Sequence, residues 1–336
     1  MDFGSDRAVK NGDFDLKALV TGGCGYVGSK LVESLAGSGC DVTSIDAEWF
    51  GNHLSSELIG VKHIRADLRG YTDFEELLDG VEAVFHLANI ANDPAVELNP
   101  SLSWEVNCLS ARALLDACSK SSSVKQFVYA SSGSVYGVRS ELNVTEAVDL
   151  TPISVYNKTK MVAERVALSY SDHFDVYIVR PATVCGLSPR MRLDVSVNAL
   201  TWSALSTSII KVFGGDQVRP NIHIEDMVGI YEFIVNESPE PGIYNAGFEN
   251  LSIREIAERV SAATNADISI DRSTNDPRSY RLDSSKLLAA GFTPKASVDI
   301  AISELCEAYR NQALWYSDQW MTVKTMLELQ QKGSLV

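Results

Sequence analysis

Tyr156 and Lys160 have the residue types and the spacing for proton transfer. They lie four positions apart within residues 155–160, and on a helix this spacing places both side chains on the same face, one turn apart. A free phenol has a pKa near ~10 and is almost fully protonated at neutral pH, but a neighbouring ammonium favours the phenolate and lowers that pKa. The pair therefore predicts a tyrosine that accepts a proton from a sugar or alcohol hydroxyl. Because the same spacing arises by chance in many helices, its meaning depends on the sequence upstream.

A glycine-rich turn lies upstream of this pair. The apolar run 16–20 leads into Thr21-Gly-Gly-Cys-Gly-Tyr-Val-Gly28, and a helix-spaced apolar stripe follows at Leu31, Val32 and Leu35. Glycines at three-residue intervals permit a sharp turn and let a pyrophosphate approach the backbone, while the N-terminus of the next helix offers unpaired N–H groups to the anion. The segment therefore predicts a strand, a phosphate-binding turn and a helix.

A second strand indicates which nucleotide this turn binds. Residues 40–45 read as a short strand that ends in Asp46, eighteen residues beyond Gly28. An acidic residue at this place accepts hydrogen bonds from the adenosine ribose hydroxyls and repels a 2′-phosphate. Residues 46–50 contain no arginine or lysine, so the sequence favours NAD over NADP as the cofactor.

Composition limits the partners and the compartment. The 336 residues carry a net charge of −15, which argues against binding of nucleic acid or an anionic membrane through a broad basic surface. A local basic pocket for a phosphorylated substrate remains compatible with this charge. The six cysteines have no metal-type spacing, so we expect no metal site and a reducing compartment. With no apolar run of about 18–20 residues and a polar start, we expect a cytoplasmic protein.

The order of patterns along the first 180 residues predicts the fold class. Strand-like and helical patterns alternate there, which is typical of a parallel sheet covered by helices on both faces. The expected strands are 61–66, 83–87, 126–130 and 176–179, and the expected helices are 72–78, 101–119 and 154–171. We therefore predict an α/β protein with a Rossmann-type, doubly wound parallel sheet, whose ligands bind at the carboxyl ends of the strands.

The regular alternation of strand and helix patterns ends after Arg180, where a loop (181–192) begins. The expected elements beyond it are a helix at 194–206, strands at 209–213 and 242–246, and helices at 225–235 and 253–263. We predict a disordered tail (1–15), an NAD-binding Rossmann domain (16–180), a smaller mixed α/β substrate domain (181–311) and a C-terminal helical segment (312–336). One helix of the substrate domain is allowed to pack back on the first domain. The apolar residues of the C-terminal segment are better explained by docking onto the core than by binding a partner.

Four motifs in order identify a family. The glycine-rich turn, Asp46, Ser131-Ser-Gly-Ser-Val-Tyr-Gly137 and the Tyr156/Lys160 pair together resemble the extended short-chain dehydrogenase/reductases, and within them the sugar-nucleotide epimerase/dehydratase group. The resemblance covers residues 17–310. It implies NAD as the cofactor, a nucleoside-diphosphate sugar as the substrate, and a homodimer that packs through the helices near 101–119 and 154–171, whose apolar stripes would also serve as core.

The resemblance also implies roles for individual residues. The expected catalytic residues are Ser132, Tyr156 as the base, and Lys160. The expected cofactor-binding residues are Gly22, Gly25, Tyr26, Val27, Gly28, Asp46, Asp67, Leu68, Leu87, Ala88 and Lys160. The expected substrate-binding residues are Ser132, Thr183, Asn198, Arg219 and Arg278, the two arginines holding the diphosphate. Asn107 matches a helix asparagine whose role is mostly structural.

Departures from the family pattern restrict the reaction. Dehydratases and decarboxylases of this group have an acidic residue two places before the equivalent of Tyr136, where this chain has Ser134. A serine hydroxyl is a poor acid at neutral pH, so elimination is disfavoured. The asparagine that usually follows the Arg180-Pro pair is absent. Residues 188–194, with Asn198, resemble a bacterial subgroup that makes surface polysaccharides, and there Arg190 and Arg192 are either substrate contacts or solvated loop charges.

These observations predict an NAD-dependent sugar-nucleotide 4-epimerase that works through a transient 4-keto intermediate. The alternative enzyme is a sugar-nucleotide 4-dehydrogenase or 4-ketoreductase with net redox, because both reactions use the same groups. A non-catalytic NAD-sensing module is disfavoured, since such proteins commonly lack the tyrosine or the lysine. The sequence leaves the nucleotide base and the sugar open.

Overall fold

The structure is a computed structural model that describes residues 16–139, 141, 143–273 and 279–335. The predicted tail 1–15 and the predicted phosphate ligand Arg278 lie outside the described residues.

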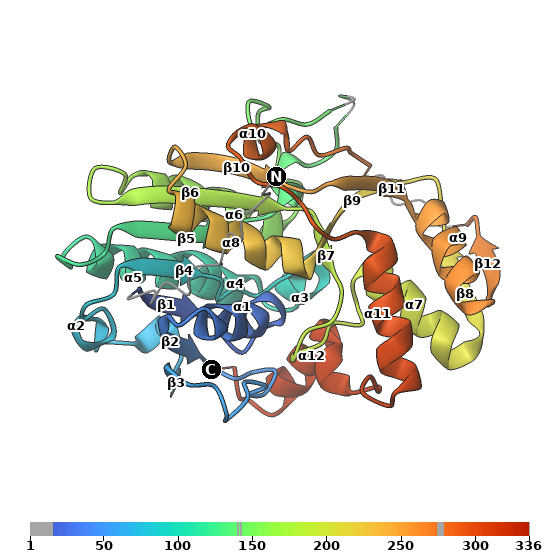
Figure 1. Cartoon of the computed structure of the whole chain (residues 1–336), viewed down its shortest axis with the longest axis horizontal. Helices are drawn as coiled ribbons and strands as arrows, with labels where there is room; N and C mark the ends of the chain where they lie inside the picture. Colours follow the sequence, from blue (N-terminus) through green and yellow to red (C-terminus); the bar gives the residue numbers. More distant parts are fainter. Residues whose placement is uncertain (1–15, 140, 142, 274–278, 336) are drawn as a thin grey trace, which may run out of the picture.

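The larger sheet is parallel throughout, as the sequence predicts. Within the described residues it has seven strands in the order β10-β6-β5-β4-β1-β2-β3 (Figure 1). The strands are β1 (Lys17–Thr21), β2 (Asp41–Asp46), β3 (Val61–Arg65), β4 (Ala83–His86), β5 (Gln126–Ala130), β6 (Asp175–Pro181) and β10 (Gly242–Ala246). Because β1 pairs with both β2 and β4, the order of the strands reverses beside β1. Ligands of open α/β sheets bind at such a reversal.

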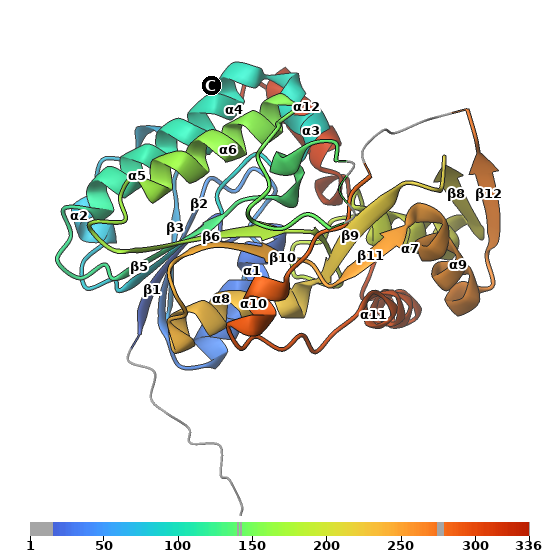
Figure 2. The same ribbon diagram turned by 90° about the horizontal axis from the view of Figure 1, so that it is seen from above.

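Helices cover both faces of this sheet (Figure 2). One face carries α1 (Tyr26–Gly37) and α8 (Ile224–Glu237), which contact each other; the other carries α4 (Pro100–Trp104), η2 (Glu105–Leu109), α5 (Ser110–Cys118) and α6 (Val155–Leu168). Alternate residues of β1 serve the two faces, because successive strand side chains point in opposite directions. Ala18 and Val20 pack in the α1/α8 core, and Leu19 packs in the α5/α6 core. Three short elements follow β3 and β4: η1 (Leu68–Gly70), α2 (Phe74–Leu77) and α3 (Asp93–Leu98), of which α3 contacts α6.

The predicted helix 101–119 contains a π-helical turn at η2. Asn107 lies in this turn and is fully buried. Its side-chain oxygen accepts from the Ile90 N–H, and its amide donates to the Ile90 carbonyl and to the Thr159 hydroxyl. The asparagine thus ties the segment after β4 to helix α6, a structural role.

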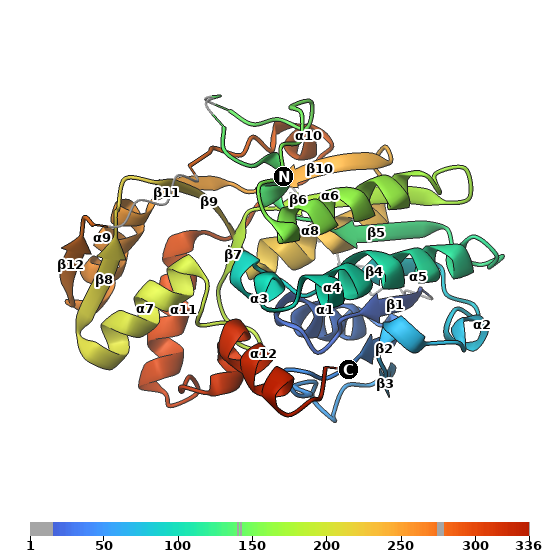
Figure 3. The same ribbon diagram turned by 180° about the vertical axis from the view of Figure 1, so that it is seen from behind.

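The smaller part of the molecule lies at one end of the large sheet (Figure 3). It contains a sheet of β11 (Glu249–Ser252), β9 (Val218–His223) and β7 (Thr183–Cys185), and a parallel pair of β12 (Asp267–Asp271) and β8 (Ile209–Phe213). Helices α7 (Ser196–Thr207), α9 (Ile253–Thr264) and α11 (Val298–Arg310) enclose its core. The predicted helices 194–206 and 253–263 and the strand 209–213 are confirmed. The strands β7, β9, β11 and β12 and the helices α3, α10 (Ser285–Ala289) and α11 were not predicted.

The chain returns to the large sheet after residue 181. Helix α8 packs against α1, as the sequence allowed for one helix, and β10 pairs in parallel with β6 along Tyr177–Pro181. The predicted boundary at residue 181 therefore does not separate the two sheets along the chain. The pairing of β10 with β6 puts Tyr244 and Ala246 in the α1/α8 core. Local sequence patterns cannot predict this pairing, because the two strands are far apart in the chain.

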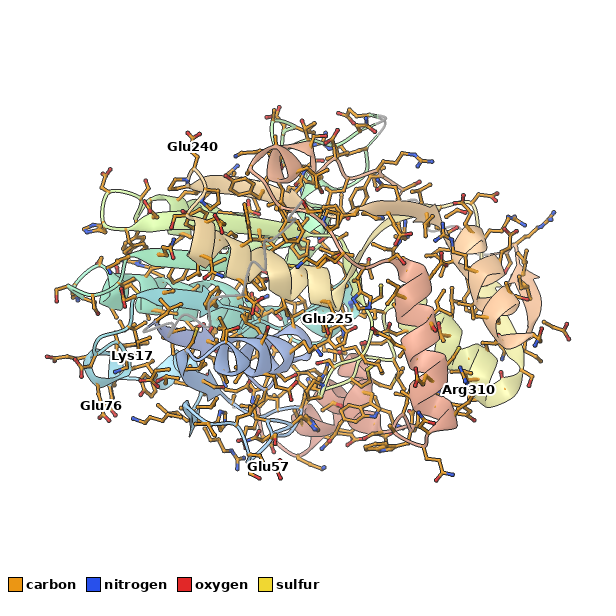
Figure 4. The ribbon with its side chains drawn as sticks, viewed as in Figure 1. Lys17, Glu57, Glu76, Glu225, Glu240 and Arg310 are labelled. Carbon is orange, nitrogen blue, oxygen red and sulfur yellow. The ribbon has the colours of Figure 1, made fainter. Side chains whose placement is uncertain are left out.

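The C-terminal segment docks onto the core, as predicted. Within its described residues, 312–335, it is helical in η4 (Asp318–Trp320) and α12 (Thr322–Gln331) and not from residue 312. Trp320 and Met326 are buried, and α12 contacts α3. Among the described residues, no helix is both long and apolar enough to cross a membrane. Acidic side chains such as Glu57, Glu76 and Glu240 project from the periphery (Figure 4), in keeping with the negative net charge.

Candidate active site

A cavity of ≈ 580 Å³ lies at the carboxyl ends of the large sheet and reaches the smaller part of the molecule. The structure brings all the predicted catalytic and cofactor-binding residues to its wall. These are Gly22, Gly25, Tyr26, Val27, Gly28, Asp46, Asp67, Leu68, Leu87, Ala88, Ser132, Tyr156 and Lys160. They come from β1, β2, β3, β4, β5 and α6 or the segments that follow them, and they meet because the ends of parallel strands share one edge of the sheet.

The glycine-rich turn has no room for side chains at two of its glycines. Gly22 has φ +76°, and a Cβ there would lie 2.7 Å from the Ala88 nitrogen; a Cβ on Gly28 would lie 2.0 Å from the Gly22 carbonyl oxygen. Helix α1 starts immediately after Gly25, and among the described residues no side chain caps its first turn. Its N–H groups and its positive dipole end are thus available to an anion. The turn fits the diphosphate of a dinucleotide.

Asp46 is held in a fixed orientation beside this turn. One carboxylate oxygen accepts from the Cys24 N–H at 3.0 Å and the other from the Glu48 N–H at 2.7 Å. Burial raises the pKa of this carboxyl, and the two backbone hydrogen bonds lower it. An oriented carboxylate at the end of β2 fits the ribose hydroxyls of NAD. Asp67 also lines the cavity, with its carboxylate paired to Arg69 at 2.7 Å.

Ser132, Tyr156 and Lys160 line the same cavity. Helix α6 begins after Ser154, whose hydroxyl accepts from the Asn157 N–H and caps the helix. The cap fixes the first turns, so that Tyr156 and Lys160 share one face. The Lys160 ammonium donates to the Ala130 carbonyl at 2.6 Å, and its nitrogen lies 5.9 Å from the centroid of the Tyr156 ring. The lysine therefore joins α6 to the end of β5.

Burial dominates the ionisation of this pair. It raises the pKa of Tyr156 to about 12; a hydrogen bond with Ser132 and the charge of Arg192 lower this pKa, whereas Asp93 raises it. Burial also lowers the pKa of Lys160 to about 7. The expectation that Lys160 brings the tyrosine pKa below ~10 is therefore wrong for this structure. Removing both groups from water disfavours both charged forms.

Serine occupies the place of the family's acid. The Ser134 hydroxyl lies 2.8 Å from that of Ser132 and accepts from the Asn157 amide at 2.9 Å. Asp93 also lines this end of the cavity, where it accepts from the Ser154 hydroxyl and from the Asn157 amide. The arrangement thus places two serine hydroxyls and one carboxylate at this end of the cavity.

A buried ion pair supports the catalytic helix from behind. Glu164 on α6 receives two hydrogen bonds from the Arg180 guanidinium, at 3.0 and 2.6 Å, and both side chains are almost fully buried. Arg180 also donates to the Tyr136 hydroxyl, which donates to the side-chain oxygen of Asn245 on β10. The network ties α6, β6 and β10 together. Sequence reasoning did not identify it, although the Arg180-Pro pair and Tyr136 both stand in recognised motifs.

The predicted substrate residues divide into two groups. Thr183 and Arg219 line the cavity, whereas Asn198 is fully buried outside its lining. The Asn198 oxygen accepts from the Gly186 N–H at 3.0 Å, and its amide donates to the Arg192 carbonyl at 2.9 Å. The structure thus places Asn198 as a brace for the loop that carries Arg192, not as a substrate contact.

The alternative that Arg190 and Arg192 are solvated loop charges is wrong. Both line the cavity. Arg190 is 3% exposed, and Arg192 forms an ion pair with Asp194 at 2.8 Å. The sequence could not decide between a substrate contact and a solvated charge, because the loop is held inside by α1 and the C-terminal segment, which are distant in the chain.

Comparisons with known proteins agree with this geometry. The sequence model of the NAD dependent epimerase/dehydratase family matches residues 18–247. The chain is 27% identical over 333 residues to a UDP-glucose 4-epimerase of Lactobacillus helveticus, covering 90% of this chain and 100% of that protein. Among solved structures, it is similar to MoeE5 in complex with UDP-glucuronic acid and NAD (TM-score 0.79, 26% identity, 88% of this chain and 99% of that one). It is also similar to the UDP-glucuronic acid 4-epimerase of Bacillus cereus in complex with UDP-glucuronic acid and NAD (TM-score 0.77, 26% identity, 89% and 100%). The chain therefore belongs to the NAD dependent epimerase/dehydratase family, as an NAD-dependent sugar-nucleotide epimerase of the extended short-chain dehydrogenase/reductase type.

Proposed function

We propose that the enzyme inverts carbon 4 of a nucleoside-diphosphate sugar through a transient 4-keto intermediate. The observation that carries this proposal is that Ser132, Tyr156 and Lys160 line one cavity with the glycine-rich turn, while Ser134 stands where a dehydratase has its acid. The first three residues can move a proton at a sugar hydroxyl beside a bound dinucleotide. The fourth gives no acid for expelling a hydroxyl group.

The protein's share of the reaction is proton transfer and positioning. Tyr156, as phenolate, takes the proton of the 4-hydroxyl, and Ser132 donates a hydrogen bond that stabilises the phenolate. Lys160, anchored to the Ala130 carbonyl, holds the nicotinamide ribose as the family resemblance implies. When bound, NAD would supply the hydride acceptor and donor for sugar carbon 4. Tyr156 gives its proton back after the ketosugar has turned its other face.

We propose that the substrate binds against the cavity wall formed by the smaller part of the molecule. Thr183 and Arg219 line it, and a guanidinium fork suits the oxygens of a diphosphate. The relatives named above include an epimerase of UDP-glucose and structures that hold UDP-glucuronic acid. We therefore propose UDP-sugars as the first substrate class to test, ahead of GDP-, CDP- and dTDP-sugars.

We also propose that the enzyme is a homodimer through the outer faces of α5 and α6. Leu109, the last residue of η2 and adjacent to α5, is 62% exposed, and a second copy packed there would cover this apolar side chain. Light scattering behind size-exclusion chromatography tests this assembly, and a monomer at micromolar concentration would contradict it.

Incubation of the purified enzyme with each sugar nucleotide tests the proposed reaction. Nuclear magnetic resonance identifies the product, and absorbance of reduced cofactor is followed in parallel. A 4-epimerase forms the C4 epimer without lasting accumulation of NADH. Accumulation of NADH or of a 4-ketosugar would contradict simple epimerisation and would favour a net 4-dehydrogenase or 4-ketoreductase.

Tyr156→Phe tests the assignment of the base. The variant should retain NAD and lose nearly all turnover, because a phenyl ring cannot take the proton. Tyr316→Phe is the matched control, since Tyr316 is about half exposed and lies outside the cavity lining. Substantial activity in Tyr156→Phe would exclude Tyr156 as the base.

A further inference from the structure

Arg190 is a buried cation whose own surroundings do not neutralise it. Its side chain is 3% exposed. Among the described residues, no carboxylate forms an ion pair with Arg190, and its Nε atom has no hydrogen-bond partner. The nearby Asp194 is engaged by Arg192. A buried charge is costly unless an opposite charge and hydrogen bonds compensate it, so this site calls for an anion.

The backbone around Arg190 is fixed against the phosphate-binding end of α1. The Arg190 N–H donates to the hydroxyl of Ser29 in the first turns of this helix at 3.4 Å. In the same loop, the Ser188 hydroxyl donates to the Tyr26 carbonyl at 2.6 Å and lies 3.1 Å from the Ser29 hydroxyl. Arg190 and Gly28 line the same cavity. The loop therefore delivers a cation beside the glycine-rich turn.

The guanidinium is held in place on two sides. Its central carbon lies 4.3 Å from the centroid of the Phe50 ring, and one terminal nitrogen donates to the Gln319 carbonyl at 3.3 Å. Stacking on Phe50 fixes the plane of the fork, and the contact with Gln319 fixes its rotation. Phe50 lies four residues after Asp46, the last residue of β2, so the cation stands on the side of the proposed ribose site.

We propose that Arg190 binds the diphosphate of NAD from the side opposite the glycine-rich turn. A planar fork with a free donor suits phosphate oxygens, which neutralise the charge and accept its hydrogen bonds. The cofactor is thus clamped between the N-terminus of α1 and the loop that follows β7. The other diphosphate that this enzyme meets is the substrate's, but the contacts of Arg190 with Ser29 and Phe50 place it on the cofactor side. The assignment requires NAD binding only and does not depend on the reaction at carbon 4.

Arg190→Met tests the assignment, because methionine keeps the apolar contact with Phe50 and removes the charge. Calorimetric titration of cofactor-stripped protein compares adenosine, ADP, ADP-ribose and UDP. The variant should bind ADP and ADP-ribose about 10- to 100-fold more weakly, the usual effect of losing a hydrogen bond to a charged group. Its affinity for adenosine and UDP should not change. Arg190→Lys, which keeps a charge without the fork, should lie between the wild type and Arg190→Met.

Arg254→Met is the control for these titrations, because Arg254 pairs with Asp216 and lies outside the cavity lining. It should leave the affinity for ADP-ribose unchanged. A second measurement separates binding from a structural role: without cofactor, Arg190→Met should unfold at the same or a higher temperature than the wild type, since an uncompensated buried charge has been removed. Equal affinities of Arg190→Met and wild type for ADP-ribose would overturn the proposal. Weaker binding of UDP instead of ADP would also overturn it, and would assign Arg190 to the substrate's diphosphate.

Discussion

Replacing Ser132 by alanine should move the ionisation of Tyr156 to higher pH. Burial raises the pKa of this phenol to about 12, and the hydrogen bond with Ser132 works in the opposite direction. A hydrogen bond to a charged group contributes about 1.5–3 kcal/mol, which equals about 1–2 pKa units. Loss of the hydroxyl destabilises the phenolate only, so the pKa of Tyr156 rises. At any pH below that pKa, the phenolate fraction then falls about 10- to 100-fold.

The assay is the pH dependence of kcat/KM for Ser132→Ala and for the wild type, from neutral pH to beyond about pH 10. Because only the phenolate accepts the proton, the variant should be slower by the same 10- to 100-fold at neutral pH. Below the pKa of about 12 the two profiles should run parallel, separated by this factor, and they should approach each other only near that pKa. Tyrosinate absorbance, taken as the difference from the Tyr156→Phe form of each protein, reports the same shift without turnover.

Ser134→Ala is the control for local packing. It removes the 2.8 Å contact between the two serine hydroxyls but leaves the Ser132 hydroxyl beside Tyr156. Its profile should shift less than that of Ser132→Ala. If the tyrosinate titration of Ser132→Ala is the same as that of the wild type while kcat/KM falls, the hydroxyl only positions the sugar and the reasoning is refuted.

Other predictions concern stability and the cofactor turn. Glu164→Gln leaves the Arg180 guanidinium buried without a counter-charge, and should lower the free energy of unfolding by about 3–5 kcal/mol; a denaturant midpoint equal to the wild type's would contradict this. Burial lowers the pKa of Lys160 to about 7 from 10.5, so the folded state loses this proton at lower pH than the unfolded state, and stability rises between these two pKa values. Lys160→Met should lack this rise, so the variant should gain most in free energy of unfolding over the wild type below about pH 7. A difference in denaturant midpoints that does not change with pH would contradict this prediction. Gly28→Ala should abolish NAD retention, because the new Cβ would lie 2.0 Å from a carbonyl oxygen of the same turn. Gly37→Ala is the control and should retain NAD, because its Cβ would meet no described atom within 4 Å. The measurement is the NAD content of the two purified proteins.

Much of the site was predictable because its chemistry is local in sequence. The glycine-rich turn and Asp46 each need only their own strand end, and the Tyr156/Lys160 pair needs one helical turn. The alternation of strands and helices then implies a parallel sheet, whose strand ends converge. Because the carboxyl ends of the strands lie together, Ser132 after β5 and Tyr156 on α6 reach the same cavity, although β5 and α6 are separate in the chain.

Residues whose environment comes from distant segments were not predictable. Asn198 is braced between Gly186 and the Arg192 carbonyl, so a residue expected to touch substrate instead fixes a loop. Helix α8 and strand β10 return to the large sheet across a boundary expected near residue 181. Short strands such as β7 and β11 have no period of their own, and exist because a neighbouring strand completes their hydrogen bonds.

The sequence by itself determined which chemical groups this protein has and the order in which strands present them. It therefore determined a phosphate-binding turn, a carboxylate for ribose, and a tyrosine with a lysine one helical turn away. Only the tertiary structure decided the charge states of these groups, because desolvation depends on everything packed around them. Burial leaves Tyr156 with a pKa of about 12 and Lys160 with one of about 7. The tertiary structure also decided that Arg190 lies inside the cavity, since the loop that carries it is held there by Ser29, Phe50 and Gln319, residues far from it in the chain.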